Sequence, residues 1–271
     1  ILRDLLGLVT LAAFLTALVA GCTSGASEAS TAQADLPRDT APAVGESDLA
    51  AFVASNSTFA LDLYQALREQ QGNLFYSPYS ISAALAMTYA GARGQTEVQM
   101  AQTMHFRLSQ DRLHPAFNAL DLQLASRGVG AKGKDDKGFR LKIANSVWGQ
   151  TGYQFEPGYL EVLARNYGAG LRLTDFQRAP EAARVKINNR VQEQTEGKIA
   201  DLLPKGAIDT LTRLVLANAV YFNAAWKYPF DSNSTHSGEF TLLNGDKVNV
   251  PMMVQLKTFG YTKGSGYQAV E

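Results

Sequence analysis

Cysteine is nearly absent from this chain of 271 residues, in which Cys22 is the only one. A single thiol cannot form an intrachain disulfide framework or a zinc site built from cysteines. An excess of charge of one sign is missing too, because 25 lysines and arginines balance 25 aspartates and glutamates. This balance argues against nucleic acid, or any other polyanion, as the main partner.

Patterns of catalytic residues are also missing. No serine lies in a G-x-S-x-G turn, no histidine pair has H-E-x-x-H spacing, and there is no phosphate-binding loop or carboxylate ladder for calcium. The chain has three histidines: His105, His114 and His236. A hydrolase with one of them as its base stays an alternative that no local pattern favours. We therefore expect a protein that is not an enzyme and needs no metal or cofactor.

The N-terminal segment differs from the rest of the chain. Residues 5–20 are almost wholly apolar, a run shorter than the ~20 residues that span a bilayer and suited to the core of a signal peptide. The run leads into Leu-Val-Ala-Gly-Cys at 18–22, which resembles the bacterial lipoprotein box, in which the cysteine is lipidated. We predict a lipoprotein signal peptide over 1–22, a lipid anchor at Cys22 and an extracytoplasmic, membrane-anchored location. An uncleaved anchor helix or an ordinary signal peptide is the alternative.

Two further parts follow the signal segment. Residues 23–46 are rich in serine, alanine, threonine and proline, with too few large apolar residues to form a core, so they are predicted to be a flexible linker. The folded domain is expected over 47–271. Because the whole chain is 46% hydrophobic and 18% charged, this domain can bury a sizeable core.

Hydrophobic periodicity predicts helices in the first half of the domain and strands towards its end. We expect helices over 49–68, 78–90, 97–104, 115–126, 157–167 and 180–196, with Thr96 as the cap of the third. We expect strands over 141–150, 171–176 and 214–222, and a hairpin that turns at Asn244-Gly245. This succession is typical of an α+β fold.

Polar residues occur where the pattern predicts burial. Ser77 suits the cap of the second helix, Pro78 its first position, and Ser80 and Ser82 follow in its first turns. Asn218 interrupts a strand that is otherwise apolar on both faces. A buried amide without partners costs about 1–3 kcal/mol, so the serines are candidate partners. The alternative is that Asn218 marks a bulge or a strand edge.

Several stretches together resemble the serpin family. They read NLFYSPYSI from 73, ALAM from 84, GARGQT from 91, TEGKI from 195, NAVYF from 218 and VPMM from 250, with Trp226 and Phe230 between the last two. They occur in the family's order and spacing from about residue 48 onwards. The resemblance implies a fold of three β-sheets and about nine helices. Of this fold the chain is expected to hold the N-terminal two-thirds, ending before the reactive centre loop.

The resemblance also implies a function. Serpins are typically inhibitors of serine or cysteine proteases, whose exposed loop is cleaved and then inserts as a strand into the large sheet of a metastable fold. Ser77, Ser80 and Asn218 would correspond to the shutter where the strands part, and Trp226 to the breach where insertion begins. We expect a monomer whose partner is a protease, with the reactive bond outside this chain. The alternative is a non-inhibitory serpin that serves as a binding or structural protein.

Overall fold

A computed structural model describes residues 31–32, 36–128, 130–131 and 138–271 of the chain. Its helices are α1 (Glu46–Leu67), α2 (Pro78–Tyr89), α3 (Gln95–Thr103), α4 (Gln110–Ser126), α5 (Pro157–Tyr167) and α6 (Pro180–Gln194). Its strands are β1 (Thr31–Ala32), β2 (Arg140–Gln150), β3 (Leu171–Thr174), β4 (Leu214–Asn223), β5 (His236–Thr241), β6 (Lys247–Met252), β7 (Tyr261–Gly264) and β8 (Tyr267–Val270). The predicted signal peptide and Cys22 lie outside the described residues.

The centre of the fold is a four-stranded mixed sheet in the order β1-β3-β2-β4. The antiparallel pair β2–β4 is long, with ten residue pairs from Arg140–Asn223 to Gly149–Leu214. The parallel pair β2–β3 has only three, beginning at Trp148–Arg172. The two long strands therefore form one ribbon, while β3 touches it at one end only. The predicted α+β class is confirmed.

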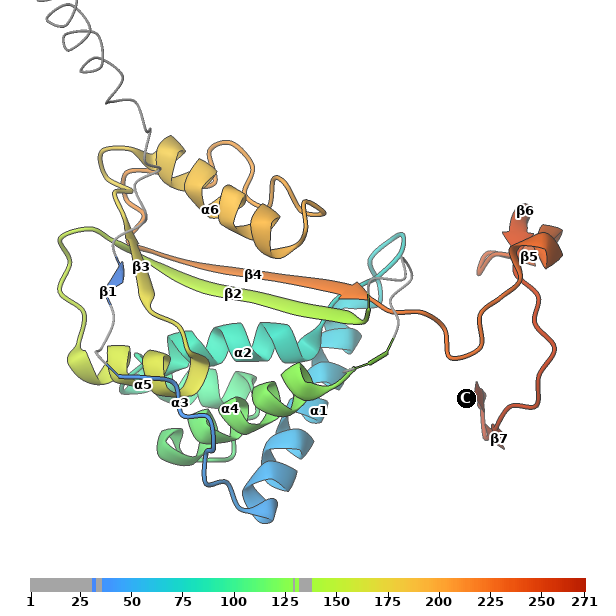
Figure 1. Cartoon of the computed structure of the whole chain (residues 1–271), viewed down its shortest axis with the longest axis horizontal. Helices are drawn as coiled ribbons and strands as arrows, with labels where there is room; N and C mark the ends of the chain where they lie inside the picture. The colour runs from blue at the N-terminus through green and yellow to red at the C-terminus, as the bar shows by residue number, and fades with distance from the viewer. Residues whose placement is uncertain (1–30, 33–35, 129, 132–137) are drawn as a thin grey trace, which may run out of the picture.

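Helices cover both faces of this sheet (Figure 1). On one face α6 lies along β2 and β4, with Ile187 and Val191 in one buried cluster with Trp148. On the other face α2 lies under the same two strands, and α1, α4 and α5 pack around it. The helical core is aromatic: the rings of Phe52 in α1 and Phe117 in α4 meet edge to face with centroids 4.5 Å apart.

Three predicted helix starts are wrong. The first helix begins at Glu46, after Gly45, and not at residue 49. The third helix begins at Gln95, after Gly94, and Thr96 lies inside it. Gly94 has φ +60°, a conformation open mainly to glycine, and this lets the chain turn into the helix before the predicted cap.

The fourth helix begins at Gln110 instead of Pro115, which the helix accommodates in its second turn. The reason is packing, because Leu113 and Phe117 are both fully buried one turn apart. Burial of that face outweighs the single backbone hydrogen bond that proline removes.

Part of the predicted linker is held against the domain. In the described residues of 23–46, Arg38 donates from Nε to Asn118 Oδ1 at 2.9 Å and pairs through Nη2 with Asp121 Oδ2 at 2.6 Å. The packed domain therefore begins before residue 47. Composition did not indicate this, because the segment is fixed by polar contacts to α4 together with a single large apolar contact, that of Val44 with the helical core. Among the described residues, no helix is long and apolar enough to cross a membrane.

Two hairpins follow β4. The pair β5–β6 turns at Asn244-Gly245, as predicted, with φ +90° at Gly245. The pair β7–β8 turns at Gly266. Figure 1 shows both hairpins to one side of the helix–sheet–helix layers, connected to them by the chain that leaves β4.

Candidate functional site: a polar cluster beneath the central strands

A polar cluster joins the two long strands to the helix beneath them. Asn145 of β2 and Asn218 of β4 are direct cross-strand partners. The Asn218 amide donates to Asn145 Oδ1, to Ser80 Oγ and, at 3.1 Å, to the carbonyl oxygen of Ser80. Of the serines at the helix start, Ser80 is thus a partner of Asn218, as expected. The pairing runs through Asn218 without a bulge, although β4 is an edge strand of the sheet in the described residues.

The start of α2 places the serine of this cluster. Ser77 has extended backbone and its Oγ accepts a hydrogen bond from Ser80 N at 3.3 Å, while Pro78 holds the first helical position. Ser80 comes one turn into the helix and is fully buried. Since Ser80 also contacts Asn218, the cap residue orients the turn that carries the strand contact. Ser77 itself lies one hydrogen bond away from the strands.

Asn145 belongs to the cluster although sequence reasoning did not select it. Asn145 falls on the strand face that carries Leu141, Ile143 and Val147, so it is a polar residue on an apolar face, as Asn218 is. The sequence also places one asparagine near the centre of each long strand, and two such residues can face each other when the strands pair antiparallel. A single sequence does not determine the register between two strands, and the structure shows that Asn145 and Asn218 are paired.

The cluster is suited to rearrangement and not to bond chemistry. Its members are amides and hydroxyls, which can accept and donate in several arrangements. A dry, interlocked apolar core would resist such a change. Ser82 is also fully buried, but it lies on the face of α2 that carries Ala86 in the helical core, so it is not part of the cluster.

The three histidines do not form a catalytic pair with a serine in the described structure. His105 Nε2 contacts Asp62 Oδ2 at 2.7 Å, and His236 Nδ1 lies 3.3 Å from a backbone carbonyl oxygen. His114 is buried, with Nδ1 2.7 Å from Tyr167 Oη. Burial, together with the charge of Arg93, lowers the pKa of His114 to about 4. A neutral imidazole locked to a tyrosine in the helical core has a packing role.

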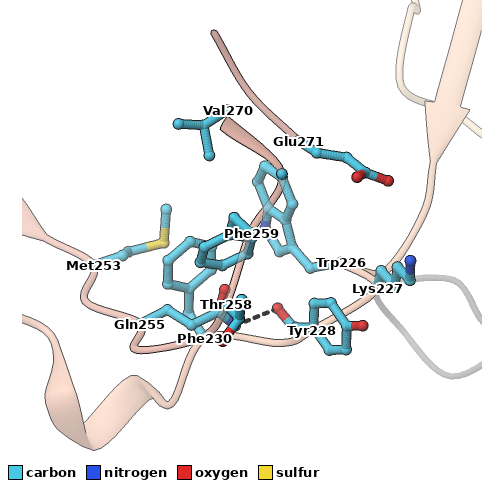
Figure 2. Close-up of a pocket in the computed structure, with 11 residues that line it drawn as sticks. Trp226, Lys227, Tyr228, Phe230, Met253, Gln255, Thr258, Phe259, Val270 and Glu271 are labelled. Carbon is cyan, nitrogen blue, oxygen red and sulfur yellow. Dashed lines mark hydrogen bonds between the residues drawn. The ribbon is translucent and has the colours of Figure 1, made fainter. Parts of the chain in front are cut away.

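Trp226 lies apart from the cluster, beyond the end of β4. It is 66% exposed, and its ring meets that of Phe230 edge to face with centroids 5.5 Å apart. Figure 2 shows these two rings with Phe259 and Met253 around a cavity of about 550 Å³. The Gln255 amide closes the loop by donating to the Tyr228 carbonyl oxygen at 2.6 Å. Trp226 thus belongs to the segment that connects the sheet to the hairpins.

Together these features define a class: an α+β protein with a mixed sheet between helices and a polar joint under its central strands. The sequence model of the serpin (serine protease inhibitor) family matches residues 54–271. The chain therefore belongs to the serpin family.

Curated relatives agree with this assignment. The chain is 44% identical over 214 residues to a pig leukocyte elastase inhibitor, and the match covers 78% of this chain and 54% of the relative. It is 42% identical over 210 residues to the human leukocyte elastase inhibitor, covering 77% of this chain and 53% of the relative. The chain thus spans about half the length of the curated relatives it matches.

Solved structures share the fold. The Arabidopsis protein AtSerpin1, in its native stressed conformation, superposes with a TM-score of 0.70 at 28% identity, over 84% of this chain and 57% of that one. Emu ovalbumin superposes with a TM-score of 0.68 at 27% identity, over 78% of this chain and 55% of that one. The serpin-like fold expected from the sequence is confirmed.

Proposed function

We propose that the full-length protein inhibits a serine protease, with a cysteine protease as the less supported target, by letting a cleaved reactive loop insert beside β4. The observation that carries the proposal is the Asn145–Asn218–Ser80 cluster, because it couples the two long strands to α2 through exchangeable hydrogen bonds. The names of the relatives, which are elastase inhibitors, favour an elastase-like enzyme as the first target to try.

Insertion needs a sheet that accepts another strand. β4 is the edge strand of the four-stranded sheet in the described residues, so its outer backbone groups can pair with an added strand. The cluster lies under the middle of β4, on the strand with which an inserted strand would pair. We propose that the reactive loop belongs to sequence beyond this chain. We also propose that Trp226, which follows β4, lies where insertion begins.

The test uses the full-length protein and active elastase. A covalent 1:1 complex that survives boiling in detergent is expected, and elastase blocked at its active serine should give none. Cleavage of the protein with no complex and fully active elastase would reject inhibition. In that case the protein would be a non-inhibitory serpin with a binding or structural role.

We also propose that Cys22 carries a lipid that anchors a monomer outside the cytoplasmic membrane, with residues after it as a tether. The Leu-Val-Ala-Gly-Cys sequence supports this proposal. Mass spectrometry of the mature N-terminus should find a lipidated Cys22, and Cys22→Ser should release the protein from the membrane fraction. An unmodified N-terminus at another residue would contradict the proposal.

A further inference from the structure

A second polar site lies between β2 and β3, next to α6, and Asn145 of the polar cluster forms part of its wall. The β2–β3 pairing begins only at Trp148–Arg172, so the two strands part before it, beside Ser146. The space between them is a cavity of about 310 Å³, large compared with the ~30 Å³ of a water molecule in the liquid. Its lining includes Ser146, Gln194 and the guanidinium-bearing Arg172 and Arg190.

Two arginines from different elements meet at this cavity. Arg172 comes from β3, and its guanidinium lies over the ring of Trp148, 5.8 Å from the centroid. Among the described residues it forms no ion pair. Arg190 comes from α6, and its carboxylate contact is Glu193 at 3.7 Å, a residue whose side chain is 69% exposed. The local charge at the cavity therefore stays positive.

Part of this positive charge is left without a hydrogen-bond acceptor. Nε of Arg190 is buried and has no partner among the described residues. Burial and the neighbouring Arg190 lower the pKa of Arg172, while Glu193 raises it, so the charges of Arg172 and Arg190 lie within range of each other and Glu193 offsets part of their repulsion. A buried N–H without an acceptor and two cations near one another are both relieved by an anion between them.

We propose that this cavity binds a phosphate-type oxyanion between Arg172 and Arg190. A tetrahedral dianion offers each planar guanidinium two oxygens, which a chloride ion cannot do. The hydroxyl of Ser146 and the amide of Gln194 provide further polar contacts on the wall. Because one arginine belongs to β3 and the other to α6, a bound oxyanion would tie the helix to the edge of the sheet. No residue of β4, beside which the reactive loop is proposed to insert, lines the cavity, and Asn145 is the one residue that it shares with the polar cluster.

The first test is a calorimetric titration of the chain with inorganic phosphate, with sodium chloride at matched ionic strength as the reference. Saturable one-site binding is expected with phosphate and not with chloride. Glycerol 2-phosphate serves as the second probe: binding at least as tight as that of phosphate assigns the site to phosphate esters, and weaker binding assigns it to the free ion. Identical responses to phosphate and chloride would overturn the proposal.

Variants then locate the site. Arg172→Gln and Arg190→Gln should each weaken phosphate binding at least tenfold. Arg178→Gln, an exposed arginine before α6 that does not line the cavity, should leave it unchanged. Equal affinity in all three variants would place the phosphate elsewhere and refute the assignment. If a glutamine variant fails to fold, the arginine Nε resonances of the parent chain decide, since those of Arg172 and Arg190 must shift on phosphate addition.

Discussion

Asn218→Ala tests the polar cluster most directly. The substitution removes the amide that donates to Ser80 and to Asn145, and leaves Asn145 Oδ1 and Ser80 Oγ without their donor. A polar group left unpaired in a partly buried site costs about 1–3 kcal/mol. We expect the free energy of unfolding to fall by about 2 kcal/mol, with the smaller side chain adding a little through lost packing.

Urea unfolding followed by circular dichroism measures this change. With a slope of about 2 kcal/mol per molar, the unfolding midpoint should fall by about 1 M at an unchanged slope. Asn233→Ala, in the exposed turn before β5, is the matched control and should stay within about 0.5 kcal/mol of the parent. Both variants replace an asparagine with alanine, so the difference between their unfolding midpoints reports the contacts of Asn218.

A double-mutant cycle with Asn145→Ala separates the pair from its surroundings. Asn218→Ala leaves Asn145 Oδ1 without its donor, and Asn145→Ala removes one acceptor of the Asn218 amide, which keeps Ser80. The double variant removes both groups, so its cost should be smaller than the sum by about 0.5–3 kcal/mol. Strict additivity, together with a parent-like midpoint for Asn218→Ala, would refute the view that these residues hold the strands to each other and to α2.

Three other predictions concern local structure. Ser77→Ala removes the cap bond to Ser80 N and should cost about 1 kcal/mol in the same urea assay; Ser77→Asp, which keeps an acceptor, should not. Gly149→Ala should cost about 1–3 kcal/mol, because an added methyl would lie 2.5 Å from the Phe155 ring, whereas Gly158→Ala meets no atom within 4 Å and should be neutral or stabilising. The pKa of His114 is lowered to about 4 in the folded protein, so on acidification the unfolded chain binds a proton at this residue before the folded chain does. The free energy of unfolding should therefore fall from about pH 6.5 down to pH 4, by on the order of 3 kcal/mol. His114→Gln should lose this part of the pH dependence.

Each of these expectations can fail separately. A parent-like midpoint for Ser77→Ala would mean that Pro78 alone starts the helix. Equal effects at the two glycines would mean that the strand can shift to admit a methyl group. An unchanged pH profile in His114→Gln, measured as the urea midpoint between pH 7 and pH 4, would assign the acid sensitivity to other groups.

Periodicity and turn residues predicted most of the elements, because each is encoded within a few neighbouring residues. The start of α2 at Ser77-Pro78 and the hairpin at Asn244-Gly245 are local signals of this kind. The beginning of α4 is not local, since the burial of Leu113 overrides the signal of Pro115. The partner of Asn218 on β2 depends on strand register, which is set by the whole sheet, so only the Ser80 half of the cluster could be anticipated.

The contact between Asn218 and Ser80 also has a consequence for the order of folding. The two residues are 138 positions apart in the chain, and closing so long a loop carries a large entropic cost before any contact forms. We expect the helices α1, α2 and α4 to associate first and this contact to form after the transition state. Asn218→Ala should then speed unfolding and leave the refolding rate nearly unchanged, and a slowed refolding arm in a stopped-flow chevron would show the opposite order. The hydrogen bonds between Asn218 and Ser80 would thus be among the last contacts formed during folding and the first broken during unfolding.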